Sequence, residues 1–183
     1  MPSAPSSVGR RLIACLEAYR RKDYEAALIH FFPALDKVAK RRRPKDGVGS
    51  RIRGFLRDEE VLISAIASGI VFKGLKSDGL TFEEAIYKFG RTAILHEGEL
   101  DPRLTFVDSG DWSIGETWRL PNTYILAMCV AVMVSPECHG ETISTEGAMT
   151  LLGREWRFGE LWGAENQVKA HVADFFGRPG LFA

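Results

Sequence analysis

The chain has 183 residues, which is enough to bury a core of its own and suits one domain. Its 45% hydrophobic and 26% charged residues are typical of a globular protein, and its net charge of zero excludes a strongly basic nucleic-acid binder. Any contact with nucleic acid must therefore depend on a local basic patch. Three cysteines fit no disulfide framework, and Cys15 and Cys129 lie in apolar helical runs, which predicts buried free thiols in a reducing compartment.

Residues 1–6 are rich in serine and proline and predict a disordered lead-in without an apolar leader segment. The most apolar run, 124–134, is too short to cross a bilayer. We therefore expect no membrane association, a cytoplasmic protein, and a single domain over residues 7–183.

The first half of the chain has helical periodicity throughout. A first helix is expected over residues 7–21, and Asp23 is placed to cap a second, in which Pro33 should produce a kink rather than a break. That helix ends in the basic run 37–45, before Gly47. Ser50 is expected to open a third helix. Its predicted buried positions are Ile52, Phe55, Leu56, Leu62, Ile63 and Ile66.

Residues 81–101 predict one long helix that is apolar on two faces. Thr81 and Glu84 have the spacing of a capping box at its start. One apolar stripe is suited to the protein core, and further apolar residues surround Arg91 on the opposite side. A helix with two apolar faces is expected to contact its own core and a partner.

The second half mixes short strands with helices. We expect a small β-hairpin formed by residues 104–107 and 112–118, then a fully buried helix from Pro121. A weaker hairpin is expected over 149–158, followed by a last helix over 164–176 with Val168, Val172 and Phe175 on its apolar side. The predicted fold class is mainly α: an up-down helical bundle with a small β-hairpin after the 81–101 helix.

Arg91 and His96, with four residues between them, are the candidate catalytic side chains. An imidazole can exchange protons during phosphodiester cleavage, and a guanidinium can hold a phosphate and offset transition-state charge. RNA carries its own nucleophile, the 2′-hydroxyl, so these groups would need no metal or cofactor. On an α-helix the two side chains point about 140° apart, so two copies of the helix would have to meet for all four to share a cleft. Alternatively, His96 complements the helix dipole and Arg91 is an ordinary surface residue.

The segment LTFEEAIYKFGRTAILHEGEL resembles the signature helix of the HEPN superfamily of helical ribonucleases and RNA-binding modules. That family carries an Arg, four to six intervening residues and a His, often in a phrase close to "LY..R…LVHEG". The matching residues are Tyr87, Arg91, Leu95, His96, Glu97 and Gly98.

The resemblance implies a homodimer through this helix and a metal-independent endoribonuclease that cleaves RNA through a 2′,3′-cyclic phosphate. It implies His96 as general acid or base and Arg91 as phosphate clamp, with Thr92 and Glu97 in support. The residue after the Arg is typically Asn, Asp or His in active members, whereas here it is Thr92. The alternative is a non-catalytic HEPN-like module that binds RNA or a protein such as an antitoxin or defence effector. A third interpretation is an unrelated helical bundle.

Three further groups each have two interpretations. The basic run could bind RNA or could be a solvated helix end, and its candidate residues are Lys40, Arg41, Arg42, Arg43 and Lys45. The aromatic cluster could stack bases, although anchoring of the hairpins is favoured; it comprises Trp112, Trp118, Trp156, Phe158 and Trp162. Cys138 and His139 are adjacent but lack the spacing of a zinc site, and no metal is expected.

Overall fold

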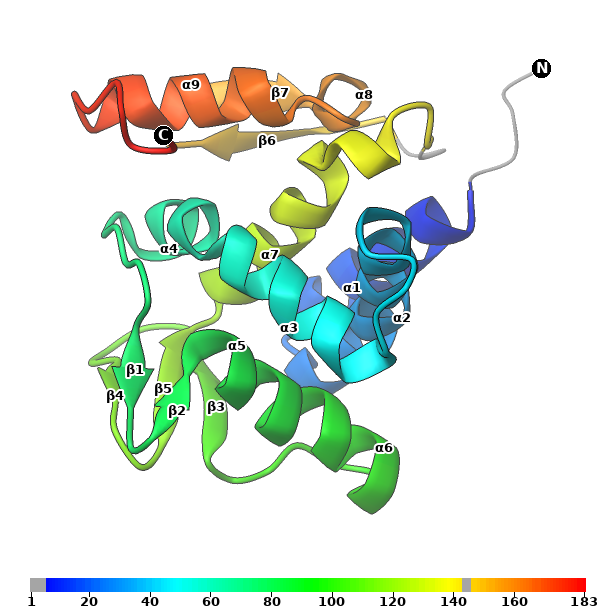
Figure 1. The fold of residues 1–183 in the computed structure, drawn as a ribbon, viewed down its shortest axis with the longest axis vertical. Coiled ribbons are helices and arrows are strands. Elements are labelled where there is room, and N and C mark those ends of the chain that lie inside the picture. The colour runs from blue at the N-terminus through cyan, green and yellow to red at the C-terminus, as the bar shows by residue number, and fades with distance from the viewer. Residues whose placement is uncertain (1–5, 143–145) are drawn as a thin grey trace.

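A computed structural model describes residues 6–142 and 146–183. The expected lead-in over 1–6 lies outside these residues except for Ser6. Figure 1 shows three levels: the C-terminal elements at one end, a group of helices in the middle, and the short strands with the 82–97 helix at the opposite end. The fold is mainly helical with small separate sheets, which confirms the predicted class at that level.

The first two helices are present as predicted and pack against each other. Helix α1 (Ser7–Arg20) begins where the Ser6 side chain accepts a hydrogen bond from the Gly9 amide at 3.0 Å. Helix α2 (Tyr24–Arg42) begins where Asp23 accepts from the Ala26 amide at 3.0 Å, as expected for a helix cap. Pro33 lies inside α2, and the helix continues past it.

The third predicted helix is in fact two helices. Helix α3 (Val48–Asp58) and helix α4 (Glu60–Ser68) are separated by a turn at Glu59. The apolar periodicity does not reveal this break, because both helices bury their apolar residues in the same core. Glu59 is only 2% exposed and lies 2.7 Å from the Arg42 guanidinium, so the turn places a carboxylate where it can form a buried ion pair.

The predicted 81–101 helix is present over Phe82–Glu97, which we call the motif helix. It comprises α5 (Phe82–Ala85), the π-helical segment η1 (Ile86–Thr92) and α6 (Ala93–Glu97). A two-stranded hairpin, β1 (Lys76–Ser77) and β2 (Leu80–Thr81), leads into it. The Glu84 carboxylate accepts from the Thr81 amide at 2.9 Å, as the capping box predicted, and Gly98 ends the helix at φ 81°.

The hairpin predicted for 104–118 is wrong in its pairing. Strands β3 (Leu104–Val107), β4 (Ser113–Ile114) and β5 (Trp118–Pro121) form one sheet in the order β3-β5-β4. β5 lies between the other two, parallel to β3 and antiparallel to β4. Parallel pairing puts Leu104 beside Trp118, and both are buried, so core packing outweighs the shorter connection between β3 and β4.

Helix α7 (Thr123–Val134) is the central element, and its residues 127–134 are all buried, as predicted from its continuous apolar sequence. Of the described helices, none is both long enough and apolar enough to cross a membrane. The Sγ atoms of Cys15 and Cys129 are 3.5 Å apart in the core, and both are free thiols, as expected.

After the short helix η2 (Pro136–Cys138), the C-terminal elements form a cover over one end of α7. The second predicted hairpin is confirmed as β6 (Ala148–Leu151) and β7 (Arg154–Arg157), which pair antiparallel. Helices α8 (Phe158–Leu161) and α9 (Glu165–Phe175) follow. Val168 and Val172 are buried as predicted, but Phe175, the last residue of α9, is 55% exposed.

Candidate functional site

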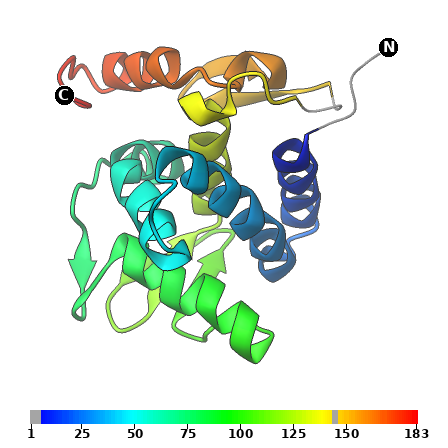
Figure 2. The same cartoon turned by 45° about the vertical axis from the view of Figure 1, so that its right-hand side comes forward.

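The motif helix runs alongside α2, as Figure 2 shows. Gly90, within the π-helical segment, makes this close approach possible, because a Cβ atom at this position would lie 2.9 Å from the Phe32 ring. π-helical turns are rare and are often found at functional sites. The segment places Arg91 at the surface between the two helices.

A groove of about 220 Å³ lies between α2 and the motif helix, and we call it the Arg91 groove. The described residues that line it are Ile29, Phe32, Pro33, Asp36, Arg91, Ile94 and Leu95. Asp36 is held by Arg51 through two hydrogen bonds of 2.7 and 3.0 Å. Because that carboxylate is already paired with Arg51, the positive charge of Arg91 remains available to a ligand.

Tyr87 fixes the position of the Arg91 side chain. Arg91 donates to the Tyr87 hydroxyl at 3.2 Å, and its guanidinium lies 5.4 Å from the centre of the Tyr87 ring. Arg53 of α3 lies 5.0 Å from the centre of the same ring. Tyr87 therefore holds two guanidinium groups together at the surface, one from the motif helix and one from α3.

Thr92 and Arg91 line different grooves. Thr92 lines a second groove of about 330 Å³, between the motif helix and α3, together with Arg53, Tyr87 and Lys88. The sequence analysis placed Thr92 in support of Arg91 and His96, whereas within one chain it lies near a separate basic surface.

His96 and Glu97 are exposed in the last turn of the motif helix. Neither side chain makes a hydrogen bond or ion pair with any residue in 6–142 or 146–183. His96 does not line the Arg91 groove. One chain therefore presents Arg91 and His96 on the same helix but does not bring them into a single pocket.

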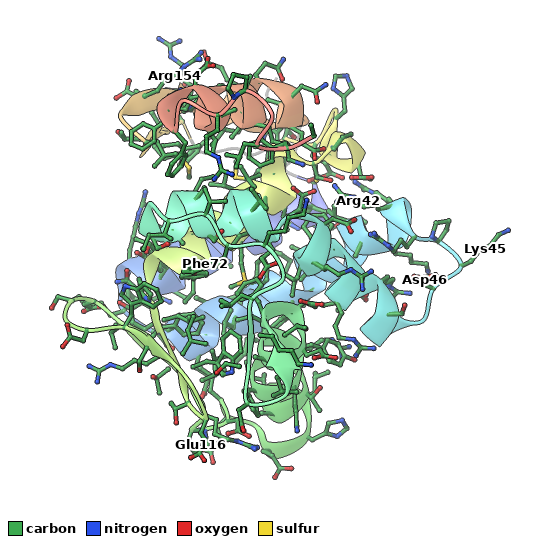
Figure 3. The ribbon with its side chains drawn as sticks, turned by 60° about the vertical axis from the view of Figure 1, so that its left-hand side comes forward. Arg42, Lys45, Asp46, Phe72, Glu116 and Arg154 are labelled. Carbon is green, nitrogen blue, oxygen red and sulfur yellow. The ribbon has the colours of Figure 1, made fainter. Side chains whose placement is uncertain are left out.

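The basic run is largely occupied by internal ion pairs. Arg42 lies 2.7 Å from Glu59 and 3.2 Å from Glu137, and its guanidinium is over the Phe55 ring at 4.4 Å. Arg41 pairs with Glu141 at 2.5 Å, and Arg43 pairs with Asp58. In Figure 3, Arg42 lies against the helices while Lys45 projects away from them.

Lys37, Lys40 and Lys45 are exposed members of the run without an ion pair to any residue that the structure describes. RNA binding by the run remains a prediction, and in this fold it would depend on these three lysines. Burial of the carboxyl group raises the pKa of Glu59 even though Lys169 and Arg42 lie beside it. Loss of Arg42 would leave this buried carboxylate without its 2.7 Å partner.

The aromatic cluster mainly anchors the strands, which is the interpretation that the sequence analysis favoured over base stacking. Trp118, Trp156 and Phe158 are buried, whereas Trp112 and Trp162 are half-buried.

Burial raises the pKa of the Cys138 thiol to about 12, so this cysteine is a poor nucleophile. Among the residues in 6–142 and 146–183, no three His, Cys, Asp or Glu side chains come together as a metal site would require.

Sequence reasoning missed the contribution of α2 to the site. Ile29 is an apolar residue on α2 that is 42% exposed beside the Arg91 groove, and Leu95 on the motif helix is 61% exposed. Nothing in the local pattern of α2 distinguishes Ile29 from a core residue. Its exposure depends on where the motif helix packs.

Comparison with known proteins places the chain in a family. The model of the Rv1289 family matches residues 7–175, a range that includes every described helix and strand. The chain is similar to the uncharacterized protein Rv1289 of Mycobacterium tuberculosis (strain ATCC 25618 / H37Rv) and the uncharacterized protein Mb1320 of Mycobacterium bovis (strain ATCC BAA-935 / AF2122/97). Each is 24% identical over 184 residues, covering 91% of this chain and 88% of the relative. No solved structure matches the chain.

Proposed function

The chain belongs to the Rv1289 family, and for it we propose a metal-independent endoribonuclease of HEPN type that acts as a homodimer. One observation carries the proposal. The motif helix presents Arg91 and an exposed His96 beside exposed apolar residues, on a surface shared with α2. This is the arrangement expected of a site that is completed by a second copy of the chain.

The apolar surface explains why the site is incomplete in one chain. Leu95 lies one residue before His96 and near Arg91, and Ile29 lies across the groove. In a twofold dimer each residue occurs twice, so pairing through Leu95 brings two copies of Arg91 and two of His96 toward one axis. Pairing also removes apolar surface from water, which favours association.

The proposed reaction requires a base, an acid and a phosphate clamp. His96 of one copy takes the proton of the 2′-hydroxyl as the O2′–P bond forms. Arg91, held by Tyr87, binds the phosphate oxygens and offsets their growing negative charge. The bond from phosphorus to O5′ then breaks, and the imidazolium formed on the same His96 returns this proton to the leaving oxygen through a water molecule. The products are a 2′,3′-cyclic phosphate and a 5′-hydroxyl, and Glu97 orients the neighbouring imidazole.

RNA cleavage in EDTA tests this proposal. His96→Ala and Arg91→Ala should each lower the cleavage rate by about 100-fold or more. His139→Ala, which removes another exposed histidine, is the matched control and should retain full activity. Equal cleavage by the wild type, His96→Ala and Arg91→Ala would remove the site assignment.

A second candidate is a non-catalytic module that binds RNA or a protein partner, such as an antitoxin or defence effector, through the same surface. It is favoured by the position of Thr92, which lines a different groove from Arg91. This candidate predicts a dimer that binds RNA or its partner without cleaving RNA and tolerates His96→Ala. A monomer in sedimentation experiments would count against both candidates and favour an unrelated helical bundle.

A further inference from the structure

A second surface pocket lies on the other side of α2, between α2 and α1, and we call it the α1–α2 pocket. Its volume is about 380 Å³. The lining side chains that can carry charge are all basic, and none of the described residues that line the pocket is an aspartate or glutamate. They are Arg10, Arg11, His30 and Lys37. In a chain with zero net charge this is a marked local excess of positive charge.

Two hydrogen bonds hold Arg11, His30 and Lys37 over the pocket. Arg11 donates to Nδ1 of His30 at 3.3 Å, and because a guanidinium only donates, Nδ1 is the acceptor. Lys37 of α2 donates to the Ser7 hydroxyl in the first turn of α1. Each contact uses one donor, whereas a guanidinium has five and an ammonium has three. The remaining donors can bind a ligand that accepts several hydrogen bonds.

No carboxylate among the described residues that line the pocket pairs with Arg11 or Lys37. Glu141, in the segment after α7, is near enough for its charge to interact with that of Lys37, but it does not line the pocket and forms its ion pair with Arg41 at 2.5 Å. A phosphate group is the ligand class that fits the charged donors of Arg11 and Lys37, the neutral hydrogen-bond donors beside them and a pocket of about 380 Å³. A phosphate also benefits from the first amides of α1, next to Ser7 and Val8.

The α1–α2 pocket and the Arg91 groove share one residue. Pro33 is exposed on α2 and lines both. On one side of it, Ile29 and Asp36 line the Arg91 groove, and on the other, His30 and Lys37 line the α1–α2 pocket. A ligand with phosphates at regular intervals can therefore pass over Pro33 and reach both.

We propose that the α1–α2 pocket binds a backbone phosphate of the RNA strand whose scissile phosphate is held at Arg91. The choice of RNA as the ligand rests on the proposed function. The pocket strengthens RNA binding and orients the strand, and it takes no part in the reaction. Because it contacts only the phosphate backbone, its contribution to the binding affinity is independent of base sequence and falls with rising salt.

The test measures RNA binding separately from cleavage. In a His96→Ala background, which blocks the proposed reaction, Arg11→Ala/Lys37→Ala should weaken binding of a labelled single-stranded RNA by about tenfold or more, measured by fluorescence anisotropy. The dependence of log affinity on log salt should become shallower by about 0.7 for each lost contact. Arg20→Ala, an exposed arginine of the same helix outside the pocket, is the matched control and should bind as its parent does.

A charge-preserving variant separates electrostatics from folding. Arg11→Lys/Lys37→Arg should retain most of the affinity, and thermal unfolding should be the same for all variants because both residues are exposed. Equal affinity for Arg11→Ala/Lys37→Ala and Arg20→Ala would overturn the pocket proposal, even if cleavage depends on Arg91 and His96. Weaker binding by the double variant together with an inactive wild type would support the pocket and refute the nuclease.

Discussion

Leu95→Asp is the variant that most clearly separates a dimeric site from a monomeric one. Leu95 is 61% exposed in the single chain, so the substitution removes no buried contact within the fold. Full burial of a leucine side chain stabilises by about 2 kcal/mol, so covering the exposed part in a dimer contributes about 1 kcal/mol per copy. A twofold interface contains Leu95 twice, which gives about 2 kcal/mol, or roughly 30-fold in Kd. Placing a carboxylate in an apolar interface weakens the dimer further.

Sedimentation velocity over a concentration series measures this Kd. Ile70→Asp is the matched control, because Ile70 is also apolar, 44% exposed and outside the Arg91 groove, just after the end of α4. We expect a weaker dimer for Leu95→Asp, an unchanged dimer for Ile70→Asp, and unfolding free energies within about 0.5 kcal/mol of the wild type for both. The same Kd for the wild type and Leu95→Asp would refute pairing through the motif helix.

Three predictions concern the scaffold and are checked by denaturant or thermal unfolding. Arg42→Ala leaves the Glu59 carboxylate buried without its 2.7 Å partner and should lower the free energy of unfolding by about 3 kcal/mol. Lys40→Ala is the control and should have little effect. Equal effects of the two substitutions on the free energy of unfolding would contradict the buried role of Arg42. Gly90→Ala places a Cβ 2.9 Å from the Phe32 ring and should cost about 1 kcal/mol, with recovery when combined with Phe32→Leu. Glu84→Gln should cost up to about 1 kcal/mol at neutral pH. Its hydrogen bond from the Thr81 amide lowers the pKa of Glu84, so the stabilisation is present above the unfolded pKa of about 4.3 and is lost as pH falls through the folded pKa. The difference from the wild type should therefore shrink in acid, and a constant difference would contradict the capping role.

The helices were predictable because their apolar residues repeat with helical spacing and their ends carry recognisable caps. Asp23 and Glu84 are examples, since each caps the helix where its position in the sequence indicated. The break at Glu59 was not predictable, because it depends on a cation supplied by α2. The parallel pairing of β3 with β5 was also missed, since local patterns do not tell which strand lies beside which.

The candidate site was predictable in its residue types but not in its geometry. Arg91 and His96 were identified from their spacing and from the resemblance of the helix around them. The separation of Thr92 into another groove, and the part played by Ile29, depend on the packing of the motif helix against α2 and α3. The π-helical segment changes which side chains share a face, and periodicity based on an α-helix does not anticipate it.

Mixing the two inactive variants tests most directly whether two chains share one site. Arg91→Ala and His96→Ala are expected to be inactive when each forms its own dimer. Refolded together, they form mixed dimers that retain one Arg91 and one His96, on different chains. If the site is shared across the dimer, RNA cleavage in EDTA reappears on mixing, at a level below that of the wild type. If the mixture remains as inactive as its parts while the mixed dimer is present, the two residues do not act across the interface and the proposed site is wrong.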